Sequence, residues 1–245
     1  MTKSSGLGDN LYIAGVNLSG DINSVKIASP SATQDVTGID KSAYERIGLL
    51  RDGSIEYKAF FNPTGAHPQL SLLPTSDQIL TYCRGTTLGA PAACLVAKQL
   101  NYDGTRGDSG EFTFAVTASA NGFGLEWASQ LTAGLRTDTG ATNGTGLDTT
   151  ASAAFGAQAY LQVTAFTGTD CTVKIQDSAD NVTFADVAGL AFTQITAAPA
   201  SQRIATGATA TIRRYVRAVT ATTGGFTSIT FSVAINKNTV SGVAF

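Results

Sequence analysis

Alternation of apolar and polar residues is the feature that most limits what this chain can fold into, and it is clearest in the C-terminal part. Successive side chains of a β-strand point to opposite faces, so alternation places one face on a core and the other toward water. Five segments show it: Tyr160–Phe166, Cys171–Gln176, Val182–Val187, Thr211–Ala218 and Phe226–Ile235. Strands at this spacing are typical of a β-sandwich, and we expect seven or eight of them in this region.

The N-terminal part also consists of short strand-like runs separated by turn residues. The runs are Leu11–Val16, Ser54–Phe61, Gln78–Cys83, Ala93–Tyr102 and Glu111–Ser119. Asp-Gly pairs within 51–54 and 101–110 indicate tight turns. One short helix is predicted at Asp40–Ile47, where Asp40 or Ser42 could cap the first turn. The fold class is therefore all-β with one flanking helix.

A stretch rich in Gly and Thr, RTDTGATNGTGLDTTA, divides the chain. We interpret residues 136–151 as a linker between an assembly domain at 1–135 and a β-sandwich domain at 152–245. Residues 1–150 hold 10 Lys and Arg against 14 Asp and Glu, a net charge of −4, so the N-terminal part is acidic.

The composition favours a protein that packs against copies of itself. The chain is 43% hydrophobic but only 14% charged, where roughly 25% is usual. A free monomer with so little surface charge is prone to associate. The net charge of −2 argues against binding nucleic acid through charge, and no segment reaches the length of a membrane span. We expect a protein that is made soluble in the cytoplasm.

No motif for catalysis, cofactor binding or metal binding emerges from the residues. His67 is the single histidine and is expected in a proline-rich surface turn, with no nucleophile placed near it. The acidic turn from Asp103 to Asp108 leaves calcium binding as an alternative to an ordinary hairpin. The three cysteines, Cys83, Cys94 and Cys171, lack the short spacings of metal sites or disulfide frameworks, so we expect buried thiols. The chain is predicted not to be an enzyme.

Four further residues have a structural and a functional interpretation. Arg213, Arg214 and Arg217 lie close together in one predicted strand, and Arg214 is expected to share a face with Ile212 and Val216. They could bind a phosphate or an acidic glycan, but pairing with carboxylates of a neighbouring copy is favoured. Trp127 could stack on a carbohydrate, but a core position is favoured.

The order of features in the N-terminal part resembles the major tail proteins, the tail-tube subunits of long-tailed double-stranded DNA bacteriophages. The resemblance covers roughly residues 8–135 and rests on an order of segments rather than one sharp motif. The segments are GDNLYIAGVNLSGD at 8–21, VTGIDKSAYERIGLLRDGSIEYKAFFNP at 36–63, ILTYCRGTTLGAPAACLVAKQLNY at 79–102 and GEFTFAVTASANGFGLEW at 110–127.

The resemblance implies a β-sandwich or barrel that assembles into rings of six by continuing its sheet into the neighbour's. Stacked rings would enclose a channel through which DNA passes without specific binding, and acidic residues would face that channel. Loops at 17–30 and 62–74 would make contacts between rings. The partners implied are copies of the chain itself and other tail or head proteins of a virion, and no membrane.

The C-terminal part resembles the immunoglobulin-like sandwiches that decorate phage tails and heads. Such a domain would face outward and could contact glycans of the host surface weakly. This addition leaves a capsid decoration or other accessory virion protein as an alternative to a tail tube. A carbohydrate-binding module is a lower alternative.

Overall fold

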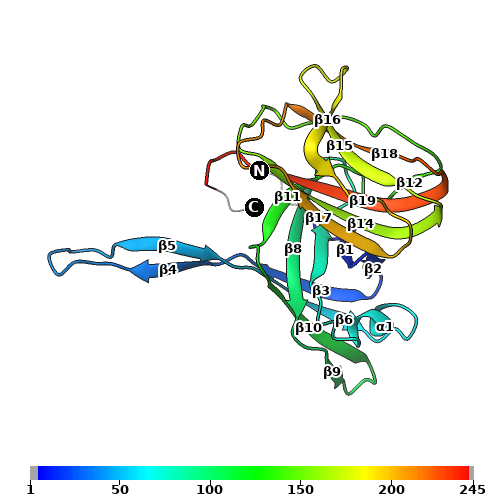
Figure 1. Ribbon diagram of the computed structural model, residues 1–245. Helices are drawn as coiled ribbons and strands as arrows, with labels where there is room; N and C mark the ends of the chain where they lie inside the picture. Colours follow the sequence, from blue (N-terminus) through cyan, green and yellow to red (C-terminus); the bar gives the residue numbers. More distant parts are fainter. Residues whose placement is uncertain (1–4, 243–245) are drawn as a thin grey trace. The chain divides into compact units, whose positions relative to one another are not determined.

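The computed structural model describes residues 5–242, and these fold almost entirely into β-strands with one short helix (Figure 1). The all-β class predicted from the alternation is confirmed. The contacts within the chain define two compact units. Unit 1 holds the chain up to Gly20, Ile79–Cys94 and the chain from Glu126 onward, and unit 2 holds Asp21–Gln78 and Leu95–Leu125.

Unit 1 is built around two sheets. The first has the strand order β17 (Ala200–Ala205), β14 (Ala157–Gly168), β19 (Phe226–Lys237), β11 (Glu126–Gln130) and the beginning of β8 (Pro91–Gln99), with β12 (Arg136–Asp138) also paired to β19. The second has the order β13 (Leu147–Asp148), β18 (Tyr215–Ala221), β15 (Thr172–Ser178) and β16 (Ala185–Ala191). All of these pairs are antiparallel.

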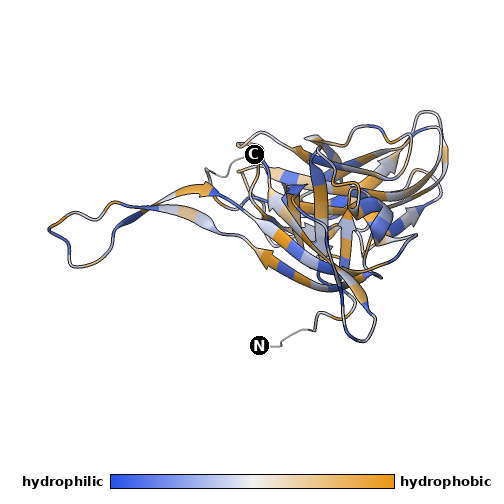
Figure 2. Cartoon of the chain, turned by 90° about the horizontal axis from the view of Figure 1, so that it is seen from below, coloured by the Kyte–Doolittle hydropathy of each residue, from blue (hydrophilic) through white to orange (hydrophobic). Residues whose placement is uncertain are grey.

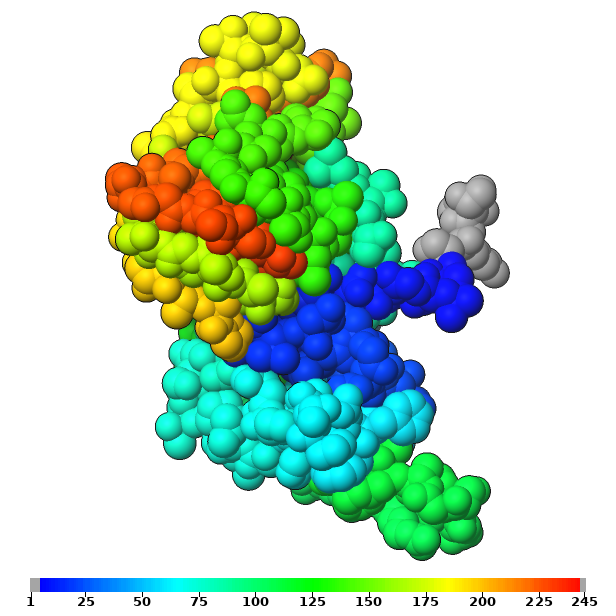
Figure 3. Space-filling view, turned by 90° about the vertical axis from the view of Figure 1, so that its right-hand side faces the viewer, coloured from blue at the N-terminus to red at the C-terminus, as the bar shows by residue number. Residues whose placement is uncertain are grey.

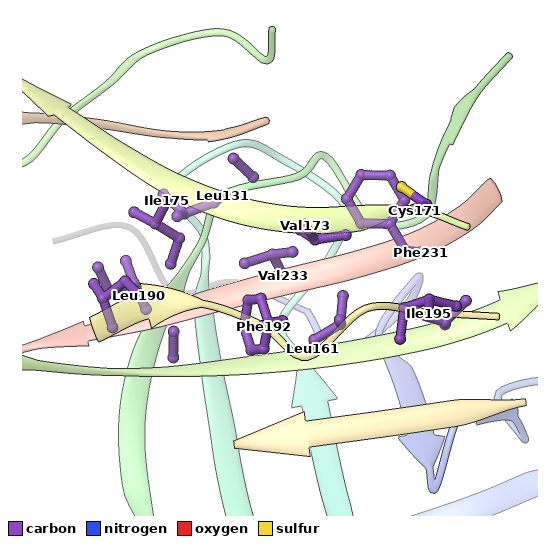
Figure 4. Packing of buried hydrophobic residues seen from close by; sticks show 14 of the residues in the cluster. Leu131, Leu161, Cys171, Val173, Ile175, Leu190, Phe192, Ile195, Phe231 and Val233 are labelled. Carbon is purple, nitrogen blue, oxygen red and sulfur yellow. The ribbon is translucent and has the colours of Figure 1, made fainter. Parts of the chain in front are cut away.

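The core of unit 1 comes from alternate residues of the strands (Figure 4). In β14, Leu161 and Val163 point to this core, and in β19 Phe231 and Val233 do so. Val173 and Ile175 of β15, with Ile212, Val216 and Ala218, supply the other side. Burying each large apolar side chain contributes about 1.5–3 kcal/mol, so this cluster is the main source of stability in unit 1.

Short strands near the N-terminus complete unit 1. β1 (Asn10–Ile13) pairs with β2 (Val16–Asn17) and with β7 (Gln78–Cys83). The buried amide of Gln162 on β14 accepts a hydrogen bond from the Gly15 N–H at 2.7 Å and donates to the Ile79 carbonyl at 2.9 Å. Gly15 has φ +83°, and a Cβ there would lie 2.4 Å from the Ala200 backbone, so only glycine fits.

Unit 2 is a smaller antiparallel sheet with the order β8 (its last residues), β10 (Phe112–Ala120), β6 (Ser54–Phe60) and β3 (Ile22–Ala28). β9 (Asp103–Arg106) forms a hairpin with β10. One face of this sheet carries the buried residues Ile55, Tyr57, Ala59, Phe114 and Val116. The helix α1 (Ala66–Leu70) adds Ala66 and Leu70 to the buried set.

A second hairpin of unit 2, β4 (Ser31–Asp35) with β5 (Arg46–Arg51), forms a separate two-stranded sheet. It extends from the end of the β3–β6 pair, with Ala28 opposite Ser54 at its base (Figure 1). We refer to residues 31–51 as the arm.

The compact units do not follow the predicted division at residues 136–151. This segment contains β12 and β13, and Asp138 is buried beside Arg136 and Thr220. Its small polar residues indicated a linker, but side-chain hydrogen bonds hold it in the sheets of unit 1. The predicted C-terminal sandwich also includes strands from the N-terminal part, which local patterns do not reveal.

The predicted helix at Asp40–Ile47 is wrong. This segment is the loop of the arm and the beginning of β5, and its residues Ala43, Tyr44 and Ile47 are exposed, so no core favours a helix there. The helix that does form is α1, inside the segment 62–74 that was expected to be a loop. The other expected loop, 17–30, contains β3, and the expected turn at 101–110 contains β9.

Candidate self-association surface

The arm is the segment of unit 2 least covered by the rest of the chain. Every residue of β4 and β5 is exposed. Six of its large apolar residues have exposed side chains: Val36, Ile39, Tyr44, Ile47, Leu49 and Leu50, the last with 83% of its surface accessible. Figure 2 shows hydrophobic stretches, in orange, along the arm.

The apolar residues of the arm lie partly on one face. Gln34 pairs with Ile47 and Asp35 with Arg46, and the Val36 N–H donates to the Glu45 carbonyl at 2.9 Å. Side chains alternate along a strand, so Val36, Ile47 and Leu49 fall on the same side of the ribbon. A two-stranded hairpin is only marginally stable alone in water. An exposed apolar face on such a hairpin indicates a site of interaction with another surface.

Local interactions shape the loop of the arm without covering it. Asp35 accepts hydrogen bonds from the Thr37 hydroxyl and N–H, and these hydrogen bonds lower the pKa of the Asp35 carboxyl. Lys41 lies 3.6 Å from Glu45, and the Arg46 guanidinium lies 4.8 Å from the centre of the Tyr44 ring. These exposed contacts are weak and leave Tyr44 accessible.

A cluster of aromatic rings lies at the opposite end of the β3–β6 pair. Tyr102 stacks on Phe114 with ring centres 3.9 Å apart, and Phe112 meets Phe114 edge-on at 4.8 Å. Phe61 contacts His67 at 4.9 Å. Phe114 is buried, but Phe61 and Phe112 remain about two-fifths exposed. Figure 3 shows α1 and its flanking residues, in cyan, on the surface of unit 2 from this side.

Three exposed leucines lie close to α1 in the sequence or next to a residue that is hydrogen-bonded to it. Leu72 and Leu73 follow α1, and the Gln99 amide, next to Leu100, donates to the Leu70 carbonyl at 2.7 Å. Leu73 has φ +43°, a conformation that costs a non-glycine residue about 1–2 kcal/mol. We call the set Phe61, Leu72, Leu73, Leu100 and Phe112 the α1-end surface.

His67 belongs to this aromatic cluster and does not lie in a surface turn. It is in α1 and half-buried, and its Nδ1 lies 2.9 Å from the Tyr102 hydroxyl. The Asp21 carboxylate accepts hydrogen bonds from the Asn62 side chain at 2.8 Å and from the Ala66 N–H at 2.9 Å, which fixes the beginning of α1. The expectation of a surface turn missed these contacts because they come from distant parts of the chain.

Trp127 is not a core residue, contrary to the prediction. It lies on β11 with 52% of its surface exposed. Its neighbours in the strand, Glu126 and Ala128, are the buried ones. The apolar sequence around Trp127 suggested burial, but the alternation along β11 places its side chain on the other face.

The three arginines of the predicted strand have partners within the chain. Arg214 pairs with Asp148 at 2.6 Å, and Arg213 lies 3.7 Å from Asp177. Arg217 donates to the Gln176 side chain at 2.7 Å and lies over the Phe184 ring. These contacts lie within unit 1, and the pairing with a neighbouring copy stays a prediction. Arg214 is exposed while Ile212 and Val216 are buried, because β18 begins only at Tyr215.

A buried polar cluster in unit 1 was not predicted. Glu126 pairs with Arg203 at 3.1 Å and accepts a hydrogen bond from the Tyr160 hydroxyl. Burial raises the pKa of Tyr160 above its usual value, so the hydroxyl remains protonated and acts as the donor. The three residues lie far apart in sequence, and only the pairing of β14 with β17 brings Tyr160 opposite Arg203.

The predicted burial of the cysteines is confirmed. Cys83, Cys94 and Cys171 are free thiols with no exposed surface. Burial raises the pKa of the Cys83 thiol to about 12 and that of Cys171 to about 11.

Within residues 5–242, no group of three or more His, Cys, Asp or Glu side chains is arranged to hold a metal ion. No helix in the same range is long and apolar enough to span a bilayer.

Comparison with known proteins gives likenesses of fold only. No protein-family profile and no curated protein matches the chain. A chain of the virion of a native gene transfer agent particle is similar at TM-score 0.42 and 12% identity, over 51% of this chain and 98% of that one. A chain from the tail of an empty gene transfer agent particle is similar at TM-score 0.41 and 14% identity, over 52% and 98%.

The Dit protein of phage SPP1 is similar at TM-score 0.34 and 12% identity, over 94% of this chain and 99% of that one. TM-scores below 0.5 at these identities assign neither a family nor a function. The fold and the exposed apolar arm define this chain as an all-β protein with a candidate surface for self-association.

Proposed function

We propose that the chain is a structural subunit of a bacteriophage virion, a tail-tube protein that associates with copies of itself into stacked rings around a DNA channel. The order of segments between residues 8 and 135 supports this proposal, and so does the low content of charged residues. In this proposal six copies form a ring, and the sandwich of unit 1 is an immunoglobulin-like accessory part on the outside.

The exposed arm is the observation that carries the proposal. The arm holds Ile47, Leu49 and Leu50 with about half or more of each residue exposed. Contact of this apolar surface with water is unfavourable until a partner covers it. A partner copy would cover these residues, as subunits in obligate assemblies do.

Electron microscopy of the purified protein tests the proposal. At high protein concentration we expect rings or tubes in negative stain, and sedimentation should show large species. Persistent monomers at every concentration would contradict the proposal. Trimers that bind preformed capsids without polymerising would instead support a decoration protein.

An arm variant makes the test specific to this surface. Changing Leu49→Thr and Leu50→Thr removes apolar area but keeps residues that favour strands. We expect this variant to remain monomeric with an unchanged melting temperature. Val182→Thr is the matched control, since Val182 is equally accessible but lies on a loop of unit 1, and this control should assemble normally.

A further inference from the structure

We propose that Asn121 is a site of spontaneous deamidation and that the carboxylate formed there repels Asp77. This inference goes beyond the proposed function and does not depend on it. The modification needs no enzyme, because its nucleophile is the backbone nitrogen of Gly122, the next residue.

Asn121 and Gly122 form an exposed bend directly after β10 in unit 2. Among residues 5–242, no protein acceptor forms a hydrogen bond with the Gly122 N–H. Gly122 has φ +79°, and apart from the adjacent residues no atom lies within 4 Å of the position that a Cβ would take there. The nitrogen therefore has neither a hydrogen bond nor a side chain to hinder it.

The reaction joins the two residues in a cyclic imide. The Gly122 nitrogen attacks Cγ of Asn121, so that a new C–N bond forms and the bond from Cγ to Nδ2 breaks. The proton of the Gly122 N–H passes through water to the leaving group, which departs as ammonia. Water then adds to one of the two imide carbonyls and opens the ring, which gives aspartate or isoaspartate without any oxidation or reduction. A nucleophile in the adjacent residue makes the first step intramolecular and therefore fast.

One hydrogen bond holds the Asn121 side chain away from this reaction. Its Nδ2 donates to the Asp77 carboxylate at 2.9 Å. The contact is exposed, so water replaces it at little cost when the side chain turns toward its own backbone. The Asn121 N–H donates to the Val96 carbonyl at 2.9 Å and keeps the bend attached to β8. The reaction thus needs motion of the side chain and of the peptide that follows it, but no opening of the sheet.

The chain has a second Asn-Gly pair, Asn143–Gly144, and this pair lacks the same freedom. The Gly144 N–H donates to the Ala218 carbonyl at 2.9 Å, and Asn143 forms a β-bridge with β18. A Cβ on Gly144 would lie 2.3 Å from the Arg136 guanidinium, so the peptide is also closely packed. Attack by this nitrogen requires that the bridge opens first, which costs free energy. The structure therefore distinguishes two pairs that are equivalent in the sequence.

The product places a negative charge beside an ion pair. The Asp77 carboxylate lies 2.8 Å from the Lys98 Nζ, which also donates to the Thr75 carbonyl. Hydrogen bonds from Lys98 and Asn121 lower the pKa of the Asp77 carboxyl, so this group is ionised at neutral pH. Deamidation replaces the Asn121 donor by a second carboxylate, and two like charges beside one lysine repel each other. The contact between the segment before β7 and the end of β10 is thereby weakened.

Peptide mapping by mass spectrometry on the full-length protein tests this inference. The protein is kept warm at mildly alkaline pH, and circular dichroism establishes that it stays folded. Samples taken over days are digested, and each Asn-Gly peptide is examined for the mass gained when an amide NH2 becomes OH. A parallel time course in denaturant gives the rate of each pair without structure.

We expect Asn121 to react in the folded protein, and Asn143 to react at least about tenfold more slowly, since its glycine first has to release a backbone hydrogen bond. In denaturant the two pairs should react at similar rates. Hydrogen exchange at residues 75–78 should rise as Asn121 is converted. Asn121→Gln is the matched control, because its longer side chain has to close a larger ring, and its exchange should stay constant over the same time.

Three results would overturn the inference. The first is an Asn121 that stays unchanged in the folded protein while it reacts in denaturant. The second is an equal rate at Asn121 and Asn143 in the folded protein, because hydrogen bonding of the glycine would then not decide the site. The third is conversion of Asn121 without any rise in exchange at residues 75–78, which would contradict the repulsion of Asp77. None of these results depends on self-association, so a failure of the proposed function is recognised separately.

Discussion

Glu126 and Arg203 form a 3.1 Å ion pair in the interior of unit 1, with 3% and 8% of their side chains exposed. The Tyr160 hydroxyl donates to the same carboxylate, and the Arg203 Nε lies 3.1 Å from the Tyr160 oxygen. The pair links β11 to β17 across β14 and β19, so it holds the first sheet of unit 1 together.

Removing one member of this pair is expected to destabilise the protein strongly. Glu126→Gln leaves a buried guanidinium without a counter-charge, which typically costs about 3–5 kcal/mol. Replacing both residues, with Glu126→Leu and Arg203→Met, should cost much less because no charge remains buried. Unfolding in urea measures the free energies. A double variant no more stable than Glu126→Gln would contradict this account.

An exposed ion pair provides the comparison. Lys26 and Glu56 lie 3.1 Å apart on unit 2, but 71% and 40% of their side chains are exposed. Lys26→Met should change the free energy of unfolding by less than about 1 kcal/mol, since water and salt screen such pairs.

A substitution at Thr150 is expected to stabilise the chain. Thr150 has φ +71°, which is unfavourable for a β-branched residue, and it is exposed. Thr150→Gly should raise the free energy of unfolding by up to about 1 kcal/mol, although glycine also gains freedom in the unfolded chain. Thermal unfolding measures the change, and Thr142→Gly at another exposed threonine should not stabilise. A lower melting temperature for Thr150→Gly would show that its hydrogen bonds outweigh the strain.

The loss of stability at acidic pH should depend on Asp148. The hydrogen bond from Arg214 and that from the Thr150 N–H lower the pKa of this carboxyl from 3.8 to about 2. A group with a lowered pKa in the folded state stabilises above its unfolded pKa, and this contribution is lost as the pH falls from about 4 to about 2.

Asp148→Asn should therefore lower the melting temperature at neutral pH and reduce its decline between about pH 4 and pH 2. Arg214→Gln should have the same effect, because it removes the main cause of the shift. Melting temperatures across this range test the prediction. A decline as steep as that of the wild type in both variants would contradict it.

The thiols should resist modification in the folded protein. Burial raises the pKa of Cys83 to about 12 and that of Cys94 well above its usual value, so hardly any thiolate forms at pH 8. A thiol reagent should react with none of the three cysteines of the native chain and with all three in denaturant. Rapid labelling of any native cysteine would show that its surroundings open readily.

The sequence predicted strands well where alternation and a core coincide. The predicted run Gln78–Cys83 is β7 residue for residue, and Phe226–Ile235 lies within β19. Prediction failed where the decisive contacts are distant. No local pattern places Ile79–Cys94 beside the C-terminal sandwich, and the arm has no core to reveal its register.

The candidate site was equally hard to predict. The segment GLLRDGS indicated a turn, and two adjacent leucines in it have the composition of a buried strand. Only the three-dimensional arrangement shows that Leu49 and Leu50 lie outside any core. The available signal for an uncovered strand was an apolar run without alternation next to an Asp-Gly pair.

Limited proteolysis should cut the unassembled chain first in the arm. Lys41 and Arg46 are exposed there, and a hairpin without a core opens at little cost in free energy, so trypsin gains access to its backbone. Arg136 and Lys174, in strands of unit 1, should resist longer because opening them disrupts the sandwich. Mass spectrometry of the early fragments identifies the sites.

Assembly should protect the arm from trypsin, because the next copy covers a docked arm. Arm cleavage should then slow in proportion to the assembled fraction, while cleavage of an added peptide substrate measures the activity of trypsin. The Leu49→Thr and Leu50→Thr variant should be cut in the arm equally fast at low and high protein concentration. Wild-type arms that remain as sensitive in sedimented assemblies as in dilute solution would show that association uses another surface.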